Sequence, residues 1–161
     1  MEDKALLSTE VASGAEKAEL LIVIPAYNEA ENIERVVNHL TANFPQYDYV
    51  VVNDGSRDET AAICQRNGYN LLNLPVNLGL AGAFQAGLKY ADKYGYQYAV
   101  QLDGDGQHRP EYLESMIKKM EEGYDIVIGS RFVGEKKPFT MRMLGSNLIE
   151  MAIRFTTGVN I

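Results

Sequence analysis

Two carboxylates on either side of one glycine carry the clearest chemical signal in this chain. Asp103-Gly104-Asp105 directly follows a run typical of a β-strand, Tyr98-Ala99-Val100-Gln101-Leu102. An open α/β sheet binds its ligands beyond the carboxyl ends of its strands. At such an edge Asp103 and Asp105 could hold Mg²⁺ or Mn²⁺ against a diphosphate, while Gly104 keeps the backbone out of the way. The alternatives are a pair that caps a turn and an EF-hand, but His108 stands where an EF-hand loop needs glycine.

Composition limits the kind of protein that this chain can be. With 161 residues, 46% hydrophobic and 23% charged, it is expected to form one soluble domain with a real core. A formal net charge of −7 argues against a nucleic-acid partner, which needs clustered Lys and Arg. The single cysteine, Cys64, can form no internal disulfide. No membrane span or signal peptide is visible, so the expected location is the cytoplasm.

Strand-like and helix-like segments alternate from about residue 20. Residues 1–19 show no sustained pattern and are expected to be a disordered leader, with residues 20–161 as the domain. Strand patterns occupy 20–24, 49–52, 71–74, 98–102 and 125–128. Helical patterns occupy 29–43, 58–68, 80–94, a segment opening at Pro110, and 141–155. This alternation predicts an α/β fold with a doubly wound, mostly parallel sheet and helices on both faces.

Polar, acidic and glycine residues follow four of the predicted strands, as a nucleotide crevice requires. These segments are Pro25-Ala26-Tyr27-Asn28-Glu29, Asn53-Asp54-Gly55-Ser56-Arg57-Asp58, Asp103-Gly104-Asp105-Gly106-Gln107 and Gly129-Ser130-Arg131. There is neither a glycine-rich dinucleotide turn after the first strand nor a Walker loop. The small residues of the third helical segment predict close packing of that helix on the sheet: Gly79, Gly82, Ala83, Ala86 and Gly87.

These segments, in this order and spacing, resemble the successive signatures of family 2 glycosyltransferases. The match rests on Ile24-Pro25-Ala26-Tyr27-Asn28-Glu29, Val52-Asn53-Asp54-Gly55-Ser56-Arg57-Asp58-Glu59-Thr60, Asn77-Leu78-Gly79-Leu80-Ala81-Gly82-Ala83, Leu102-Asp103-Gly104-Asp105-Gly106-Gln107-His108 and Gly129-Ser130-Arg131-Phe132. Within the family, the chain looks most like the dolichyl- and polyprenyl-phosphate sugar synthases. The resemblance implies the nucleotide-diphospho-sugar fold called GT-A, and transfer of a sugar from a UDP- or GDP-sugar.

The resemblance also implies roles for individual residues. Pro25, Tyr27 and Glu29 would line the nucleotide pocket, and Asp54 would accept a hydrogen bond from the base. Asn77 and Gly79 would shape the loop near the nucleotide. The residues implied to meet the ribose, the diphosphate and the metal are Asp103, Gly104 and Asp105, with Gln107 as a further oxygen ligand of Mg²⁺ or Mn²⁺. Arg131 would pair with the diphosphate or the acceptor phosphate, so that Asp103, Asp105 and Arg131 form the catalytic set.

Each of these residues also has a purely structural interpretation. Asn28 could cap a helix whose dipole Glu29 favours, and Asp54 could be a turn aspartate before Gly55. Asp58 is expected to be a helix N-cap. Arg131 could form a surface ion pair.

The chemistry favours a lipid-phosphate acceptor. A sugar hydroxyl would need a general base, whereas a polyprenyl phosphate arrives as an oxyanion, and none of the aspartates that can be placed is a convincing base. In the family an Asp-x-x-(Ser/Thr)-Gly-(Phe/Met) segment follows; this sequence stops at Ile161, so the acceptor part is expected to be missing. The helix at 141–155 could lie on a membrane, at its cytoplasmic face, or pack in a core or a homodimer.

Three functions from different classes follow. The first is a metal-dependent, inverting glycosyltransferase, and the second is a nucleotide-sugar-binding fragment without turnover. The third is a Mg²⁺-dependent phosphatase or phosphotransferase with Asp103 as nucleophile; that chemistry is expected after a first strand, with Thr or Val following the pair. The sequence does not name the sugar or the base, although we favour uracil.

Overall fold

The computed structural model describes residues 19–104 and 110–129. The leader expected at residues 1–19, apart from Glu19, and the helix expected at 141–155 lie outside these residues. The strands and helices described below belong to the unit that ends at Asp125, and residues 126–129 belong to a second unit.

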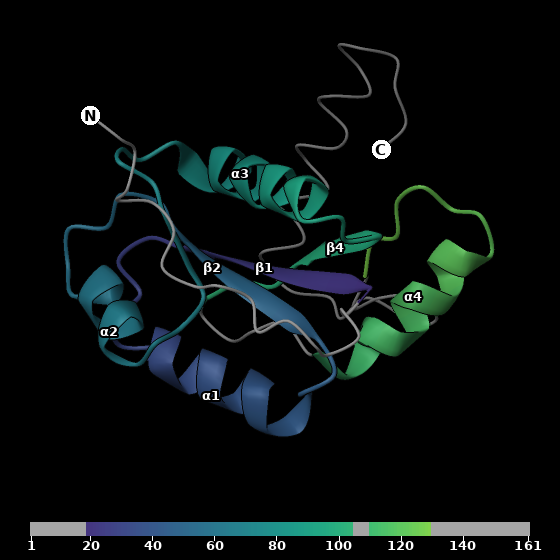
Figure 1. Cartoon of the computed structure of the whole chain (residues 1–161), viewed down its shortest axis with the longest axis horizontal. Helices are drawn as coiled ribbons and strands as arrows, with labels where there is room; N and C mark the ends of the chain where they lie inside the picture. Colours follow the sequence, from purple (N-terminus) through teal and green to yellow (C-terminus); the bar gives the residue numbers. More distant parts are fainter. Residues whose placement is uncertain (1–18, 105–109, 130–161) are drawn as a thin grey trace, which may run out of the picture. The chain divides into compact units, whose positions relative to one another are not determined.

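A parallel sheet forms the centre of the first unit (Figure 1). Its strands are β1 (Leu20–Ala26), β2 (Asp48–Asn53), β3 (Leu71–Asn73) and β4 (Tyr98–Gln101), in the spatial order β3-β2-β1-β4. Every pair of neighbours is parallel. All residues of β1 are buried, as expected for an apolar strand that is covered on both faces. The predicted doubly wound parallel sheet is therefore confirmed.

Side chains of β1 alternate between two hydrophobic layers. Leu20, Ile22 and Ile24 face a layer that includes residues of α1 (Ile33–Asn43), α2 (Thr60–Arg66) and α4 (Leu113–Glu121). Leu21 and Val23 face the opposite layer, which is covered by α3 (Gly79–Lys93). Figure 1 shows α3 on one side of the sheet and α1 and α2 on the other. The predicted helices on both faces are thus confirmed, and the strand period of two explains how one strand serves both layers.

The helices begin and end close to the predicted positions, with one exception. α1 was predicted from residue 29 but begins at Ile33, because the chain first makes a turn at Asn28, whose φ is 57°. Its buried face matches the predicted apolar stripe of Ile33, Val36, Val37 and Leu40. Gly68, at φ 68°, follows α2 as expected of a residue that ends a helix.

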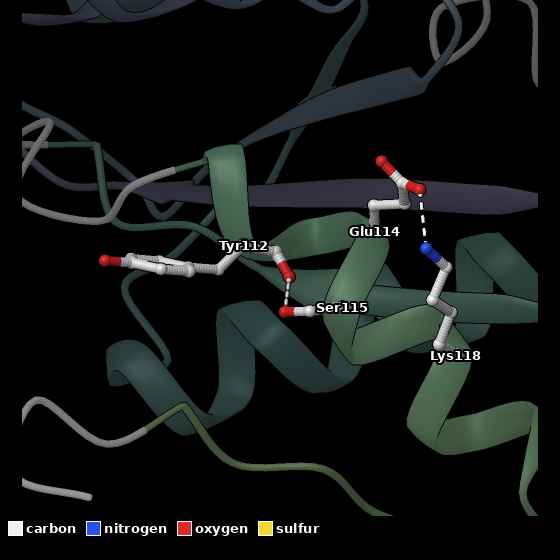
Figure 2. Close-up of polar contacts among 4 residues, drawn as sticks. All are labelled: Tyr112, Glu114, Ser115 and Lys118. Atoms are coloured by element: carbon white, nitrogen blue, oxygen red, sulfur yellow. Dashed lines mark hydrogen bonds and ion pairs between the residues drawn. The ribbon is translucent and has the colours of Figure 1, made fainter. Parts of the chain in front are cut away.

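The segment opened by Pro110 forms a short 3₁₀ turn, Pro110–Tyr112, and then α4. The Ser115 hydroxyl donates to the Tyr112 carbonyl oxygen at 2.7 Å, and Lys118 Nζ lies 2.8 Å from Glu114 Oε1 one turn away, as Figure 2 shows. Both partners of this ion pair are exposed, so it adds little to stability. α4 packs through the buried Leu113 and the partly buried Ile117 on the hydrophobic layer that includes residues of α1 and α2.

The strand predicted at 125–128 is wrong. These residues adopt no regular strand and make no ladder with any strand of the described part of the chain. The side chains of Ile126 and Ile128 are 77% and 83% exposed. A short run of β-branched residues such as Ile126-Val127-Ile128 favours a strand only where a neighbouring strand supplies hydrogen bonds, and the run alone does not reveal that neighbour.

The small residues of α3 have different roles. A Cβ at Gly87 would overlap the Val23 side chain in the centre of β1, and Ala83 is fully buried, so these two confirm the predicted close packing. Gly79 was predicted with them, but it has open space around it and a φ of 75°. It is therefore needed for its backbone conformation. A Cβ at Gly82 would meet the Leu78 side chain at 2.5 Å rather than the sheet.

Replacing Gly87 with alanine tests the contact between α3 and β1. Gly87→Ala gains about 1 kcal/mol of helix propensity. Overpacking against the rigid, buried Val23 costs about 1–3 kcal/mol. We expect the loss to dominate and the free energy of unfolding in urea to fall by about 1 kcal/mol. The matched control is Gln85→Ala on the exposed face of α3, with a change within about 0.5 kcal/mol. A Gly87→Ala variant more stable than the wild type would contradict this packing.

Candidate functional site

A pocket of about 420 Å³ opens at the carboxyl edge of the sheet. This volume lies within the range of small-molecule sites. The residues that line it come from the ends of β1, β2 and β4 and from the start of α3: Pro25, Ala26, Tyr27, Glu29, Asp54, Asn77, Gly79, Leu80, Ala83, Asp103 and Gly104.

The strand order explains the position of this pocket. Within the sheet, the chain places β2 and then β3 on one side of β1. It then crosses back and places β4 on the other side of β1. The connections after β1 and β4 therefore diverge, which leaves a crevice between them. The ladder between β1 and β4 ends at Val23 and Gln101, with a last hydrogen bond from the Leu102 N–H to the Val23 carbonyl oxygen at 2.9 Å. Pro25 and Gly104 lie just beyond it and line the pocket.

Asn28 ties the loop after β1 to the loop after β2. Its backbone N–H donates to Ser56 Oγ at 3.0 Å, and its side-chain Oδ1 accepts from the Arg57 N–H at 2.9 Å. Asn28 is also the one described non-glycine residue with a positive φ. The alternative interpretation of Asn28 as a helix cap is wrong, because its side chain bonds the other loop and α1 begins later.

Asp58 and Thr60 make a second connection between these loops. The Glu29 N–H donates to Thr60 Oγ1 at 2.9 Å, and the Ala30 N–H donates to Asp58 Oδ2 at 3.1 Å. Asp58 Oδ1 accepts from the Thr60 N–H at 3.0 Å and from the Thr60 hydroxyl at 2.5 Å. Asp58 was predicted as the N-cap of α2, but Glu59 occupies that position. Asp58 stands one residue earlier, where it bonds the first N–H of the helix and also holds the backbone beside the pocket, which the sequence did not indicate.

Asp54 is buried, with 3% of its surface exposed, and it supports the loop that leads into α3. Its Oδ1 accepts from the Leu78 N–H at 2.7 Å, and its carbonyl oxygen accepts from Asn77 Nδ2 at 3.1 Å. In the described part of the chain, every buried side-chain oxygen has a hydrogen-bond partner. For Asp54 Oδ1 that partner is the Leu78 N–H. Asp54 also lines the pocket.

Gly55 must be glycine for two reasons. Its φ is 65°, and a Cβ would lie 2.7 Å from the Asn77 backbone nitrogen. The turn after β2 can therefore approach the loop before α3 closely only because no side chain intervenes. Asn77 completes this junction by accepting from the Gly79 N–H at 3.1 Å. Asp54, Asn77 and Gly79 thus form one side of the pocket.

Glu29 and Asp103 place carboxylates on the pocket wall. Glu29 is half-buried and its Oε2 accepts from Asn32 Nδ2 at 2.9 Å. Asp103 is half-buried as well, and its Oδ1 accepts from Gln101 Nε2 at 2.8 Å. A Cβ at Gly104 would lie 3.2 Å from the Pro25 carbonyl oxygen, so a larger residue would crowd this wall.

The structure brings together eight of the residues proposed from sequence: Pro25, Tyr27, Glu29, Asp54, Asn77, Gly79, Asp103 and Gly104. Asp105, Gln107 and Arg131 lie outside the described residues. The sequence did not identify Ala26, Leu80 and Ala83 as lining residues, because nothing in their residue types distinguishes them from ordinary strand and helix residues. It also missed the role of the Thr60 side chain. The available sequence signal for that role was the position of Thr60 two residues after Asp58.

Of the three predicted metal ligands, Asp103 lies within the described residues. Asp103 offers the hard oxygen that Mg²⁺ and Mn²⁺ prefer. Among residues 19–104 and 110–129, no group of three or more acidic, histidine or cysteine side chains could hold an ion. One predicted ligand thus lies on the pocket wall, and the metal stays a prediction.

Fold and pocket together define an open α/β domain with a ligand site at its topological switch point. A sequence model described as Glycosyl transferase family 2 matches residues 21–160. The chain therefore belongs to glycosyl transferase family 2.

Relatives and solved structures agree with this family. Polyprenol monophosphomannose synthase of Mycolicibacterium smegmatis is 33% identical over 150 residues, which cover 88% of this chain and 57% of the relative. Undecaprenyl-phosphate mannosyltransferase of Micrococcus luteus is 34% identical over 119 residues, which cover 71% of this chain and 49% of the relative. The structure of S. aureus TarS 1-349 in complex with UDP is 27% identical with a TM-score of 0.51, and the match covers 64% of this chain and 32% of that one.

The chain spans about half the length of the two curated relatives. Within the described part, none of the helices has the length and apolar character needed to cross a bilayer.

The hydrogen bonds to Asp58 predict a pH-dependent stability. Burial raises the pKa of Asp58, but the Thr60 hydroxyl and the N–H groups of Thr60 and Ala30 outweigh it, so the net pKa is lowered. A carboxyl with a lowered pKa stabilises the fold above its unfolded pKa of about 3.9, and this contribution is lost as the pH falls through the folded pKa. The wild type should therefore be more stable than Asp58→Asn at neutral pH. The difference between the two proteins in the free energy of unfolding, measured in urea, should become smaller below about pH 4. A difference that does not change with pH would contradict the lowered pKa of Asp58.

Proposed function

We propose that the pocket binds the nucleoside diphosphate part of a nucleotide sugar, and that the chain belongs to an inverting glycosyltransferase whose acceptor is a polyprenyl phosphate. One observation carries this proposal. Residues from the ends of β1, β2 and β4 converge on a single pocket at the switch point of the sheet. The names of the two curated relatives support a polyprenyl-phosphate acceptor. S. aureus TarS, which shares the fold, is described in complex with UDP.

The pocket offers different chemistry at its two ends. At the β2 end, the Asp54 carboxylate would accept a hydrogen bond from an N–H group of the base, and the exposed ring of Tyr27 would offer the base an apolar surface. At the β4 end, Asp103 and Gly104 line the pocket, and the proposal places the diphosphate there. In this proposal Arg131 supplies positive charge to the diphosphate or to the acceptor phosphate.

A divalent cation belongs to the proposal. Asp103 would hold Mg²⁺ or Mn²⁺ together with Asp105 and Gln107. When bound, such an ion offsets the negative charge that develops on the departing nucleoside diphosphate. Asp103 is already oriented by the Gln101 amide, at 2.8 Å, which lowers the cost of presenting its carboxylate to a ligand.

The reaction then needs no general base from the described part of the pocket. A phosphate oxygen of the acceptor attacks the anomeric carbon from the face opposite the nucleoside diphosphate, whose bond to that carbon breaks. The phosphate is already ionised near neutral pH, so no proton has to be removed from it. A polyprenyl acceptor would place this reaction at a membrane surface, which we propose to be the cytoplasmic one.

A nucleotide-sugar-binding unit without turnover is the second candidate, because the described pocket carries donor-side residues. Calorimetric titration of the full chain with UDP, GDP and CDP, with and without Mn²⁺, tests the binding proposal. A product assay with UDP- or GDP-sugar and polyprenyl phosphate then separates transfer from binding alone. Failure of all three nucleotides to bind would contradict the proposed function.

Asp54 provides a test of the base contact. Asp54→Asn keeps a carbonyl oxygen for the Leu78 N–H but places an amide N–H₂ where the pocket now offers an acceptor. We expect nucleoside diphosphate binding to weaken by about 1–3 kcal/mol, with or without metal. Inorganic diphosphate is the control ligand and should bind both proteins alike. An equal loss for inorganic diphosphate would contradict a base contact.

The metal proposal makes a separate prediction. Asp105→Asn should remove the part of UDP or GDP binding that depends on Mn²⁺ and leave the metal-independent part and the unfolding curve unchanged, because it removes the anionic ligand only. Asp92→Asn, at an exposed position on α3, is the matched control and should keep the Mn²⁺ effect. Undiminished Mn²⁺-dependent affinity in Asp105→Asn would rule out this ligand.

A further inference from the structure

We propose that Asp58 and Thr60 are positioning residues for nucleotide binding: they fix the backbone of Glu29 and Ala30, so that the loop after β1 presents Tyr27 and Glu29 to the pocket. We call these two side chains, with the N–H groups of Glu29 and Ala30, the loop clamp. The inference rests on the proposed function, because it assigns the clamp a role in binding a nucleoside diphosphate.

The clamp is a continuous chain of hydrogen bonds. The Glu29 N–H donates to the Thr60 hydroxyl at 2.9 Å, and that hydroxyl donates to Asp58 Oδ1 at 2.5 Å. The other carboxylate oxygen, Oδ2, accepts from the Ala30 N–H at 3.1 Å. Bonds to a charged carboxylate are stronger than neutral ones, and linked bonds polarise one another. Thr60 is fully buried, so its hydroxyl has a fixed environment.

The held segment contributes directly to the pocket. Tyr27 and Glu29 both line it, although Tyr27 is 43% exposed and has little packing of its own. Two residues that bind through side chains on an exposed loop need a fixed backbone, because otherwise binding must supply the entropy cost of ordering that loop. Asp58 lies in the β2–α2 connection and Thr60 is the first residue of α2, and neither lines the pocket. They therefore act through Glu29 and Ala30.

Backbone strain at Asn28 supports the same conclusion. Its φ of 57° lies in the left-handed region, which Asn tolerates better than other residues with a Cβ but which still carries an energetic cost. Such a conformation persists only where the surroundings fix it. The clamp fixes the chain at Glu29 and Ala30, and the bonds from Asn28 to Ser56 and Arg57 fix it at the strained residue itself. The turn directs the chain from the end of β1 across the pocket edge, before α1 starts at Ile33.

Two substitutions at Thr60 separate positioning from simple stability. Thr60→Val keeps the shape and removes the hydroxyl, so the Glu29 N–H loses its acceptor. Thr60→Ser keeps the hydroxyl and removes a buried methyl group. Both changes lower stability: Thr60→Val because it leaves a donor unpaired, and Thr60→Ser because it leaves a small cavity. If affinity merely followed stability, both would weaken binding.

Affinities for UDP and GDP are measured by calorimetry on the full chain, well below the unfolding temperature of each variant. We expect Thr60→Val to bind at least about fivefold more weakly than the wild type, and Thr60→Ser to bind like the wild type. Thr41→Val, the same change at an exposed position of α1, is the matched control and should bind normally. Hydrogen exchange at the Glu29 amide gives a readout without ligand: it should be faster in Thr60→Val than in Thr60→Ser.

The other outcomes overturn the inference. Wild-type affinity in Thr60→Val would show that the clamp does not position the site. Equal weakening in both Thr60 variants would reduce it to a stability effect. If the wild type binds neither UDP nor GDP, the proposed function fails and the binding role fails with it. Faster Glu29 exchange in Thr60→Val would in that case identify the clamp as a loop anchor alone.

Discussion

The burial of β1 on both faces and between two strands is the constraint on which the rest of this structure depends. Each of its residues is buried, and it pairs with β2 from Leu21 to Ala26 and with β4 from Leu20 to Val23. The apolar layers above and below the sheet meet through its alternating side chains. Because β1 cannot shift by one residue without exchanging these two faces, its end is fixed relative to β2 and β4. The pocket residues are held at that fixed edge.

The sequence predicted this central arrangement well, for a physical reason. Apolar runs bounded by glycine and polar residues identify buried parallel strands, and the alternation with helices leaves few topologies. Pro25, Tyr27, Glu29, Asp54, Asp103 and Gly104 could therefore be placed at one edge of the sheet before their contacts were known. The strand at 125–128 was predicted wrongly, since a short apolar run does not show whether a partner strand is present.

The contacts between loops could not be predicted in the same way. Asn28 was considered as a helix cap, but it adopts a positive φ and bonds to Ser56 and Arg57 almost thirty positions along the chain. A local pattern describes what a residue does for its own segment, whereas these bonds depend on how two segments meet in space. The same is true of Asp54, whose carboxylate serves both the loop before α3 and the pocket.

Pro25 has a consequence for the chemistry of the sheet edge as a whole. Val23 turns its carbonyl oxygen toward β4, so the backbone nitrogen of Pro25, two residues later, turns the same way. Any other residue would present an N–H there that could extend the ladder toward β4. Proline has no hydrogen on this nitrogen and therefore cannot donate such a bond. The pairing of β1 with β4 ends before it, and the two chains are free to diverge where the pocket opens.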